Sequence, residues 1–396
     1  HMPPELSYQV KLGSAMITLF YRALCTGSPP LACSLLTFCI HAYSFALLGL
    51  VAPSRRGASA RARTIHGTST ATLTSHHPSF LVSFLVCVCV CVCVFLNQEA
   101  QTANRIVQEL RGISGAFRIS EGVDGTHGII ADLDIGGAQG GGAGNAATMT
   151  IMLRADMDAL PIQEAGSAAY KSQNDGVMHA CGHDAHLAIL LATARALARP
   201  DVNASMQPGL VRFVFQPAEE GGAGAKRMIA GGCLDGVDRV FGLHVWNFMD
   251  AGTIGIREGP ITANSDRIYI DITGAGGHGS MPQGTVDAVL VAAHLVVALH
   301  SGVVSRACDP FDAVCLTVGK ITGGRVANAI AGSARLDGTV RTRTAAVQQM
   351  VMEKIQQICA GVALTFGATI DCEYRKGYPA TVSSRRLEFQ IWRATS

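Results

Sequence analysis

The chain has 396 residues, 15% of them charged, and a formal net charge of +2 at pH 7. No block of basic residues occurs, which excludes the charge pattern typical of nucleic-acid-binding proteins. At about 150 residues per domain, the length predicts two or three domains.

The thirteen cysteines divide the chain into two unlike parts. Seven lie before residue 98, and the other six are scattered singly without the spacing of a disulfide framework. Isolated cysteines favour a reducing compartment. We therefore expect a cytoplasmic protein.

Residues 10–98 are unlike the rest of the chain. A membrane helix needs roughly 20 apolar residues. The apolar run 31–52 is long enough for such a helix, and the length of the run 80–96 is marginal. Residues 87–94 are a pure Cys-Val repeat, which a simple TG nucleotide repeat would encode. We interpret 10–98 as a non-native insert, the translation of a retained intron, which separates 1–9 from the rest of one catalytic domain. The alternative is a membrane-anchored protein with genuine spans at 31–52 and 80–96.

From residue 99 the chain has regular periodicity. An amphipathic helix is predicted over 99–110, and a buried strand over 149–153 follows a loop rich in glycine and alanine. Asp156 and Asp158 come directly after this strand. Such carboxylates either orient a metal-bound imidazole or simply cap the loop.

The segment 178–186, MHACGHDAH, holds one thiol, three imidazoles and one carboxylate, and an apolar helical run over 187–198 follows it. Cys181 and His183 are two residues apart, so in an extended corner they face the same side. A thiolate and an imidazole from one corner are typical ligands of a divalent transition metal. The alternative is a loop with a buried cysteine and solvated histidines.

Two further strands, predicted over 210–215 and 239–243, end in donor residues. Glu219 and Glu220 follow the first, and adjacent glutamates leaving a strand point opposite ways, so one can bind a metal while the other acts as a general base. His244 ends the second strand; elsewhere such a histidine is often a core residue. In α/β sheets, sites form at the carboxyl ends of strands. The pattern predicts a dinuclear-metal hydrolase.

Four motifs in this order, LRADMDALPIQE, MHACGHDAHLAILL, FQPAEEGGAGAKRMI and FGLHVW, resemble the M20 metallopeptidase family. The resemblance is to its N-acyl-amino-acid amidohydrolase branch, with aminoacylase-like, hippurate and auxin-conjugate hydrolases, and covers 1–9 and about 99–382. It implies two divalent metal ions, Zn or Mn, and a small N-acyl amino acid as substrate. The implied metal ligands are Cys181, which would bridge the ions, His183, Glu220 and His244. Glu219 would be the catalytic base, and Asp158 would contact a metal ligand without binding the metal itself.

A second unit is predicted between 264 and 376. Its elements follow the order β-α-β-β-α-β, with strands over 267–273, 313–319, 333–341 and 367–374 and helices over 285–304 and 344–361, which is ferredoxin-like. In the family such an insert forms the dimer, so we expect a homodimer through 264–376.

Three residues of this insert match family positions that contact substrate. The turn GGHGSMP carries His278, which in the family reaches the partner's site and polarises the scissile carbonyl; a solvated loop histidine is the alternative. Asn328 and Arg341 match positions that hold the substrate carboxylate or carbonyl, although the residues around Asn328 depart from the family's FNVIP.

The expected fold is α/β: a metallo-exopeptidase-like catalytic domain over 99–263, a ferredoxin-like dimerisation domain over 264–376, and a truncated return to the catalytic domain over 377–396. The family supplies a last histidine ligand in that return, whereas the final histidine here is His300. We therefore expect a metal-dependent amidohydrolase whose catalytic domain is incomplete. The alternative is an inactive product that keeps only metal binding and dimerisation.

Overall fold

In a computed structural model of the chain, β1 (Gly13–Phe20) is described as a backbone strand, and the other described residues are 99–113, 116–137, 149–167, 171–248, 254–255, 257–304, 309 and 312–384. The apolar runs 31–52 and 80–96 lie outside this set. Within it, no helix is both long and apolar enough to cross a membrane. The chain divides into two units, one of 1–259 and 383–396 and the other of 260–382.

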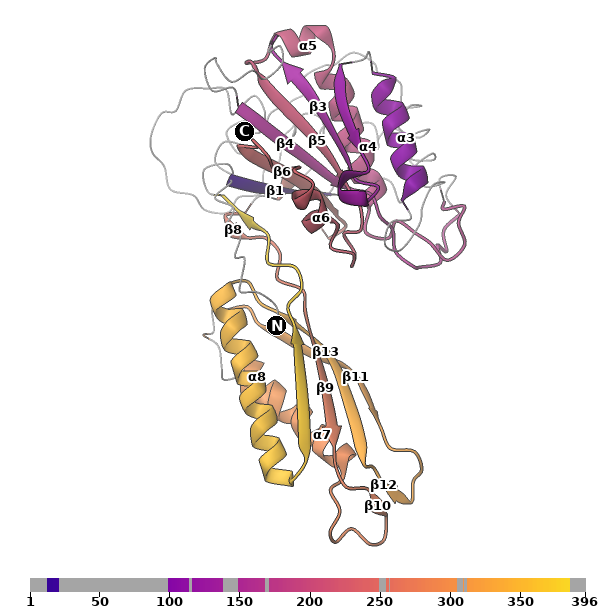
Figure 1. Cartoon of the computed structure of the whole chain (residues 1–396), viewed down its shortest axis with the longest axis vertical. Helices are drawn as coiled ribbons and strands as arrows, with labels where there is room; N and C mark the ends of the chain where they lie inside the picture. The colour runs from indigo at the N-terminus through magenta and orange to yellow at the C-terminus, as the bar shows by residue number, and fades with distance from the viewer. Residues whose placement is uncertain are drawn as a thin grey trace. The chain divides into compact units, whose positions relative to one another are not determined.

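The first unit is built on a seven-stranded sheet of order β2-β3-β5-β4-β6-β1-β7, shown in Figure 1. The central strands β4, β5 and β6 run parallel to one another, and β1 continues this direction beside β6. The bounds are β2 (Phe117–Glu121), β3 (Ile129–Ile135), β4 (Met149–Asp156), β5 (Gly209–Gln216), β6 (Arg239–Trp246) and β7 (Ile254–Gly255). All three predicted strands at 149–153, 210–215 and 239–243 are present, each extended by up to three residues at an end.

Helices cover both faces of this sheet, because its central strands are apolar on both sides. One face packs Leu153 and Phe213 against α3 (Ala100–Arg111) and α4 (His183–Leu197). The other face packs Met152 and Val214 against α6 (Gly224–Ala230) and the 3-10 turn η1 (Val123–Gly125). A short helix, α5 (Pro200–Ala204), follows α4. The arrangement confirms the α/β fold and the amphipathic helix predicted at 99–110.

Strand β1 falls within the segment 10–98 that we interpret as a non-native insert. It pairs with β6 along its whole length, with Thr18 opposite His244, and antiparallel with β7 on its other side. The remainder of 10–98 lies outside the described residues, so its origin stays a prediction.

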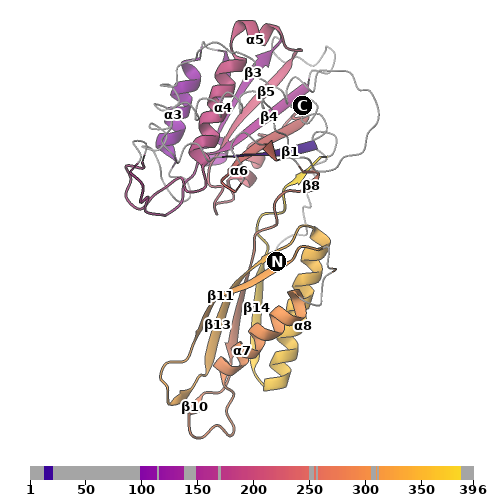
Figure 2. The same cartoon turned by 180° about the vertical axis from the view of Figure 1, so that it is seen from behind.

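The second unit is a four-stranded antiparallel sheet of order β11-β13-β9-β14. Its main elements are β9 (Asp266–Thr273), α7 (Ala288–Leu299), β11 (Cys315–Gly323), β13 (Ser333–Arg341), α8 (Ala345–Phe366) and β14 (Thr369–Arg375). The order β-α-β-β-α-β is the one predicted. Figure 2 shows both helices on one face of the sheet, where Ile268, Ile270 and Leu336 are fully buried.

Local chemistry explains where these elements differ from prediction. Helix α7 begins at Ala288 rather than 285 because the Asp287 carboxylate accepts the Val289 N–H at 2.9 Å, an N-cap. Its last predicted turn is a π-helix, η2 (His300–Val304). Two short strands, β10 (Gly277–His278) and β12 (Ala329–Ile330), pair at one end of the unit. Strand β8 (Gly259–Pro260) pairs with β15 (Val382–Ser383). The second unit spans 260–382 and includes the predicted range 264–376.

Asp266, at the start of β9, accepts hydrogen bonds from four residues of this second unit. One oxygen of its fully buried carboxylate accepts from Asn264 Nδ2 (2.8 Å), Gln348 Nε2 (2.7 Å) and the Tyr374 hydroxyl (2.6 Å). The other oxygen accepts the Gly377 N–H at 2.9 Å. A buried carboxylate is tolerated when its lone pairs are satisfied in this way. The residue therefore ties together the start of β9, the first turn of α8 and the end of β14.

Removing this carboxylate should destabilise the second unit. Asp266→Ala leaves buried donors without an acceptor, and we expect a loss of roughly 2–5 kcal/mol in the free energy of unfolding. Urea denaturation followed by circular dichroism measures it. Asp271→Ala on the same strand removes only exposed contacts to Arg335 and should change stability by less than about 1 kcal/mol. Equal effects of the two substitutions would contradict the role given to Asp266.

Candidate metal centre

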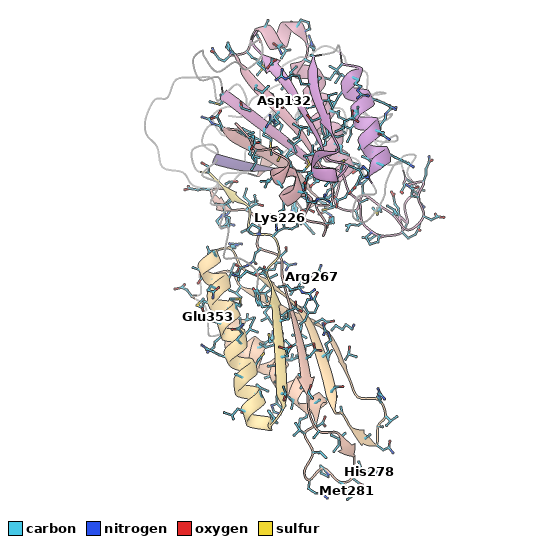
Figure 3. The ribbon with its side chains drawn as sticks, viewed as in Figure 1. Asp132, Lys226, Arg267, His278, Met281 and Glu353 are labelled. Atoms are coloured by element: carbon cyan, nitrogen blue, oxygen red, sulfur yellow. The ribbon has the colours of Figure 1, made fainter. Side chains whose placement is uncertain are left out.

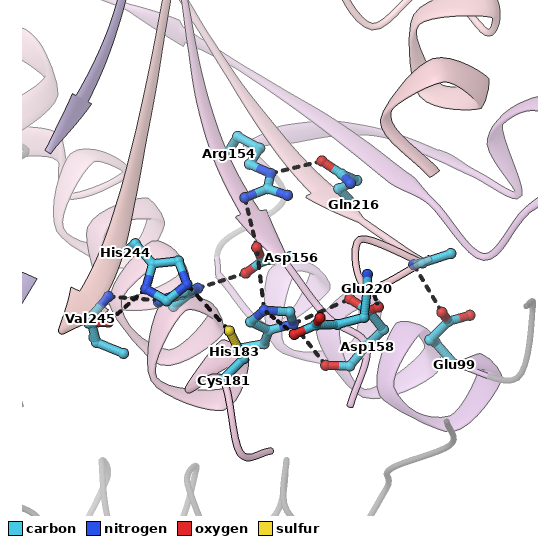
Figure 4. Close-up of polar contacts among 12 residues, drawn as sticks. Glu99, Arg154, Asp156, Asp158, Cys181, His183, Gln216, Glu220, His244 and Val245 are labelled. Carbon is cyan, nitrogen blue, oxygen red and sulfur yellow. Dashed lines mark hydrogen bonds and ion pairs between the residues drawn. The ribbon is translucent and has the colours of Figure 1, made fainter. Parts of the chain in front are cut away.

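Donor side chains converge where β4, β5 and β6 end and α4 begins, as Figure 4 shows. Three groups of possible ligand atoms, each group within 4.8 Å, contain His183: one with Cys181 and His244, one with Glu219 and Glu220, and one with Asp156 and His186. Hydrogen bonds distinguish ligand candidates from supporting residues within these groups.

His183 has one ring nitrogen committed and one free. Its Nδ1 lies 2.9 Å from the main-chain oxygen of Asp158. A carbonyl oxygen only accepts, so Nδ1 carries the proton and the lone pair of the neutral ring is on Nε2. Nε2 is buried without a hydrogen-bond partner among the described residues, 3.9 Å from a Glu220 carboxylate oxygen. An orphaned buried lone pair of this kind fits a cation.

His244 is fixed in the same way. Its Nδ1 lies 2.6 Å from the carbonyl oxygen of Val245, which assigns the proton to Nδ1 and the lone pair to Nε2. That Nε2 is 3.3 Å from Cys181 Sγ. Cys181 and His183 converge through a turn, not through the extended corner we expected, because Gly182 between them adopts a left-handed conformation with φ of 83°. A side chain at 182 would also meet Val245, since a Cβ would lie 2.4 Å from its Cγ2.

The positions of Glu219 and Glu220 differ from those predicted from the sequence. We expected them to leave a strand and point opposite ways, but β5 ends at Gln216 and both lie in a turn. Each presents a carboxylate oxygen within 4.8 Å of the His183 ligand atom. The expectation of opposite directions was wrong because strand alternation stops at Pro217, which has no N–H to continue the ladder.

His186 is not available as a ligand. The Val245 N–H donates to its Nε2 at 2.9 Å, and its Nδ1 donates to Asp156 at 2.6 Å, so both ring nitrogens are used. Asp156 also accepts from Arg154 at 2.7 Å. Asp156 and His186 therefore form a hydrogen-bonded pair that supports the site beside His183. We had not assigned a role to His186; its position three residues after His183, on the same helix face, was the available signal.

Asp158 supports two ligand candidates, as its predicted role implies. One of its oxygens accepts the Glu220 N–H at 2.9 Å, and the other lies 3.2 Å from His183 Nδ1. Burial opposes its ionisation, yet the contacts with His183 and the Glu220 N–H lower its pKa.

Electrostatics favour a cation at this point. Burial alone would lower the pKa of His183, but the carboxylates of Asp156 and Asp158 outweigh it and raise the pKa to about 11. A cation at Nε2 would replace that proton. Burial raises the pKa of the Cys181 thiol, and coordination to a metal would favour the thiolate. Burial, together with the Asp156 charge, also raises the pKa of Glu219, as suits a proton acceptor.

The predicted substrate residues of the second unit do not all come together. His278 and Asn328 lie on the paired tips, where the Gly279 N–H donates to the Asn328 oxygen at 2.8 Å; Figure 3 labels His278 and Met281 there. Arg341 is the last residue of β13, at the other end of the sheet, and donates to the Asp266 carbonyl at 3.3 Å. Nine residues of β13 separate the two positions, roughly 25 Å at about 3.3 Å per residue.

The family model of peptidase family M20/M25/M40 matches residues 152–395, more than half of the chain. The chain belongs to this family. The matched region includes every predicted ligand and extends beyond residue 382, where we had placed the end of the resemblance.

Individual relatives agree with this assignment. An N-acyl-L-amino acid amidohydrolase of Geobacillus stearothermophilus is 41% identical over 236 residues, 59% of this chain and 62% of that one. The chain thus spans about three fifths of that curated relative's length. A proposed aminohydrolase of Staphylococcus aureus superposes with a TM-score of 0.72 at 33% identity, over 79% of both chains. The YXEP protein of Bacillus subtilis, described as a dinuclear metal-binding peptidase of the M20 family, gives a TM-score of 0.64 at 30% identity, over 78% of this chain and 77% of that one.

Substitutions in the turn that carries Glu219 and Glu220 test this geometry. A Cβ at Gly224 would lie 1.7 Å from the Pro217 carbonyl oxygen, whereas one at Gly221 would meet nothing within 4 Å. Gly224→Ala should therefore displace Glu219 and Glu220 and weaken zinc binding by about tenfold or more. Gly221→Ala is the matched control and should bind zinc normally. Competition with a chromophoric chelator measures both; equal affinities would show that the turn does not position a ligand.

Proposed function

We propose that this chain hydrolyses the amide bond of small N-acyl amino acids, using two divalent cations, Zn or Mn. The observation that supports this proposal is that a buried imidazole, His183, and a half-buried one, His244, each with Nδ1 bound to a carbonyl, direct Nε2 toward a thiol and a carboxylate beside a second glutamate. The names of the related amidohydrolase and the related dinuclear metal-binding peptidase support the reaction and the metal content.

Cys181, His183, Glu220 and His244 would hold the cations. His183 Nε2 has one lone pair and would hold one ion, while the Cys181 sulfur lies within 4.8 Å of the ligand atoms of both His183 and His244. A mixed set of sulfur, nitrogen and oxygen donors is compatible with Zn and Mn. When bound, the cations would supply Lewis-acid polarisation and acidify water.

Glu219 would perform the proton transfers. Its carboxylate accepts a proton from the attacking water as the new C–O bond forms at the amide carbon. It then returns that proton to the leaving nitrogen as the C–N bond breaks. The products are a carboxylic acid and a free amino acid, so all atoms of the water are accounted for.

We include a homodimer through 264–376 in the proposal. His278 and Arg341 are too far apart in one unit to contact one small substrate, so a second copy would supply one of them. An uncharged face of α7 is exposed at Val289, Leu290 and Val297, and β11 is an edge strand. Exposed apolar patches and open edges favour association. A cytoplasmic location is also proposed, supported by five free cysteines among the described residues.

Substituting the proposed base separates its role from metal binding. Glu219→Gln should lower kcat for release of free amino acid by about 10²–10⁴-fold while metal content is unchanged. Cys181→Ser should instead lose metal, because a hydroxyl is a poor substitute for a thiolate. Turnover on N-acetyl amino acids and metal content by mass spectrometry measure both. Loss of metal from Glu219→Gln would make Glu219 a ligand and exchange the two glutamates' roles.

The dimer has its own test. Leu290→Asp combined with Val297→Asp places two charges on the exposed face of α7 and should yield a monomer in sedimentation velocity. Leu364→Asp, at an 87% exposed residue of α8, is the control and should leave the dimer intact. A dimer that survives the double substitution would exclude α7 as the interface.

A further inference from the structure

We propose that Glu99 is a positioning residue that fixes the turn bearing Glu219 and Glu220; the inference rests on the proposed function for the roles of those two residues. Glu99 immediately precedes α3 and is only 1% exposed. Its Oε1 accepts the Ala218 N–H at 3.1 Å, a contact between residues 119 positions apart. Figure 4 shows this contact beside the metal centre.

The turn needs such support because regular structure holds only its ends. Strand β5 stops at Gln216 and α6 starts at Gly224. Ala218 adopts a left-handed backbone conformation with φ of 50°, which residues other than glycine rarely adopt. Its carbonyl accepts the N–H groups of Gly222 (3.3 Å) and Gly224 (3.1 Å), so the turn is organised around Ala218.

Two carboxylates hold the backbone on either side of the proposed base. Glu99 accepts the Ala218 N–H, and Asp158 accepts the Glu220 N–H at 2.9 Å. Hydrogen bonds to ionised acceptors are stronger than those between neutral groups. Glu219 lies between these two contacts, so they restrict the direction in which its carboxylate leaves the backbone.

Two observations argue against a purely local role for Glu99. It occupies the N-cap position of α3, yet its side chain makes no capping hydrogen bond to that helix. Its second oxygen, Oε2, is buried without a partner among the described residues. Burial raises the pKa of Glu99 and the Asp158 charge adds to this, while the backbone N–H of Glu99 itself and that of Ala218 oppose it. Such a residue is costly to bury, and the contact with the Ala218 N–H is its compensation from outside its own segment.

Three variants test the inference. Glu99→Ala removes the acceptor, and Glu99→Gln keeps a side-chain oxygen that can still accept the Ala218 N–H. Glu109→Ala is the matched control, because Glu109 lies on the same helix but pairs with Arg105 and Arg195. The first measurement is amide hydrogen exchange, by mass spectrometry of peptides covering 216–224 and, for comparison, 209–215 in the metal-free chain.

We expect Glu99→Ala to accelerate exchange in 216–224 by about tenfold or more and to leave 209–215 unchanged, since only the turn loses its anchor. Glu99→Gln should restore most of the protection. Unchanged exchange in 216–224, or the same change in Glu109→Ala, would overturn the inference.

The second measurement is a titration with cobalt(II), followed by its visible absorption. Displacement of Glu220 in Glu99→Ala should alter the d–d bands and weaken cobalt affinity by about 10–100-fold, with rescue by Glu99→Gln. Identical spectra and affinities would contradict the positioning role. A chain that binds no cobalt before substitution would refute the proposed function, and the exchange data would still decide whether Glu99 fixes the turn.

Discussion

A main-chain carbonyl determines which ring nitrogen each of the two proposed ligand imidazoles can offer to a metal ion. His183 and His244 both donate Nδ1–H to backbone oxygens, and both therefore turn Nε2 toward the same small volume. His186 also donates its Nδ1–H, to Asp156, but a backbone N–H already occupies the lone pair of its Nε2. The centre thus depends on backbone groups that the fold has already placed at the ends of β4 and β6, and side-chain identity alone does not distinguish the three histidines.

The charged groups around these imidazoles are also fixed by partners that the fold supplies. Burial opposes ionisation of Asp156, yet Arg154 and His186 lower its pKa well below the usual range. Burial also lowers the pKa of His186, to about 4, so that this ring stays neutral. Arg154 is held in turn by Gln216, at the end of the neighbouring strand, at 2.8 Å. The junction of β4 and β5 therefore places a negatively charged carboxylate, that of Asp156, beside the proposed cation site. This buried charge is tolerated because it has partners of its own.

Much of this could be predicted from the sequence, because parallel buried strands are apolar on both faces and their carboxyl ends meet. The proposed ligand set follows from the positions of Cys181, His183, Glu220 and His244, each close after such an end or at the start of the helix that follows. What could not be predicted depends on backbone conformation. The left-handed Ala218 and the hydrogen bonds that exclude His186 have no signature in residue type, and glycine at 182 permits a left-handed conformation without requiring it. Glu99 could not be found either, since a contact across 119 residues is visible only in three dimensions.

The two ends of the second unit are neighbours, since β9 begins and β14 ends side by side with Arg267 opposite Arg375. Asp266 binds the chain at both ends, at Asn264 and at Gly377. Joining neighbouring points of a host domain by a folded insert adds little loop-closure entropy, because the ends are already close. This geometry makes the second unit modular. A short linker could replace it in the chain, and the unit could vary in sequence or be exchanged without changing the seven-stranded sheet of the first unit.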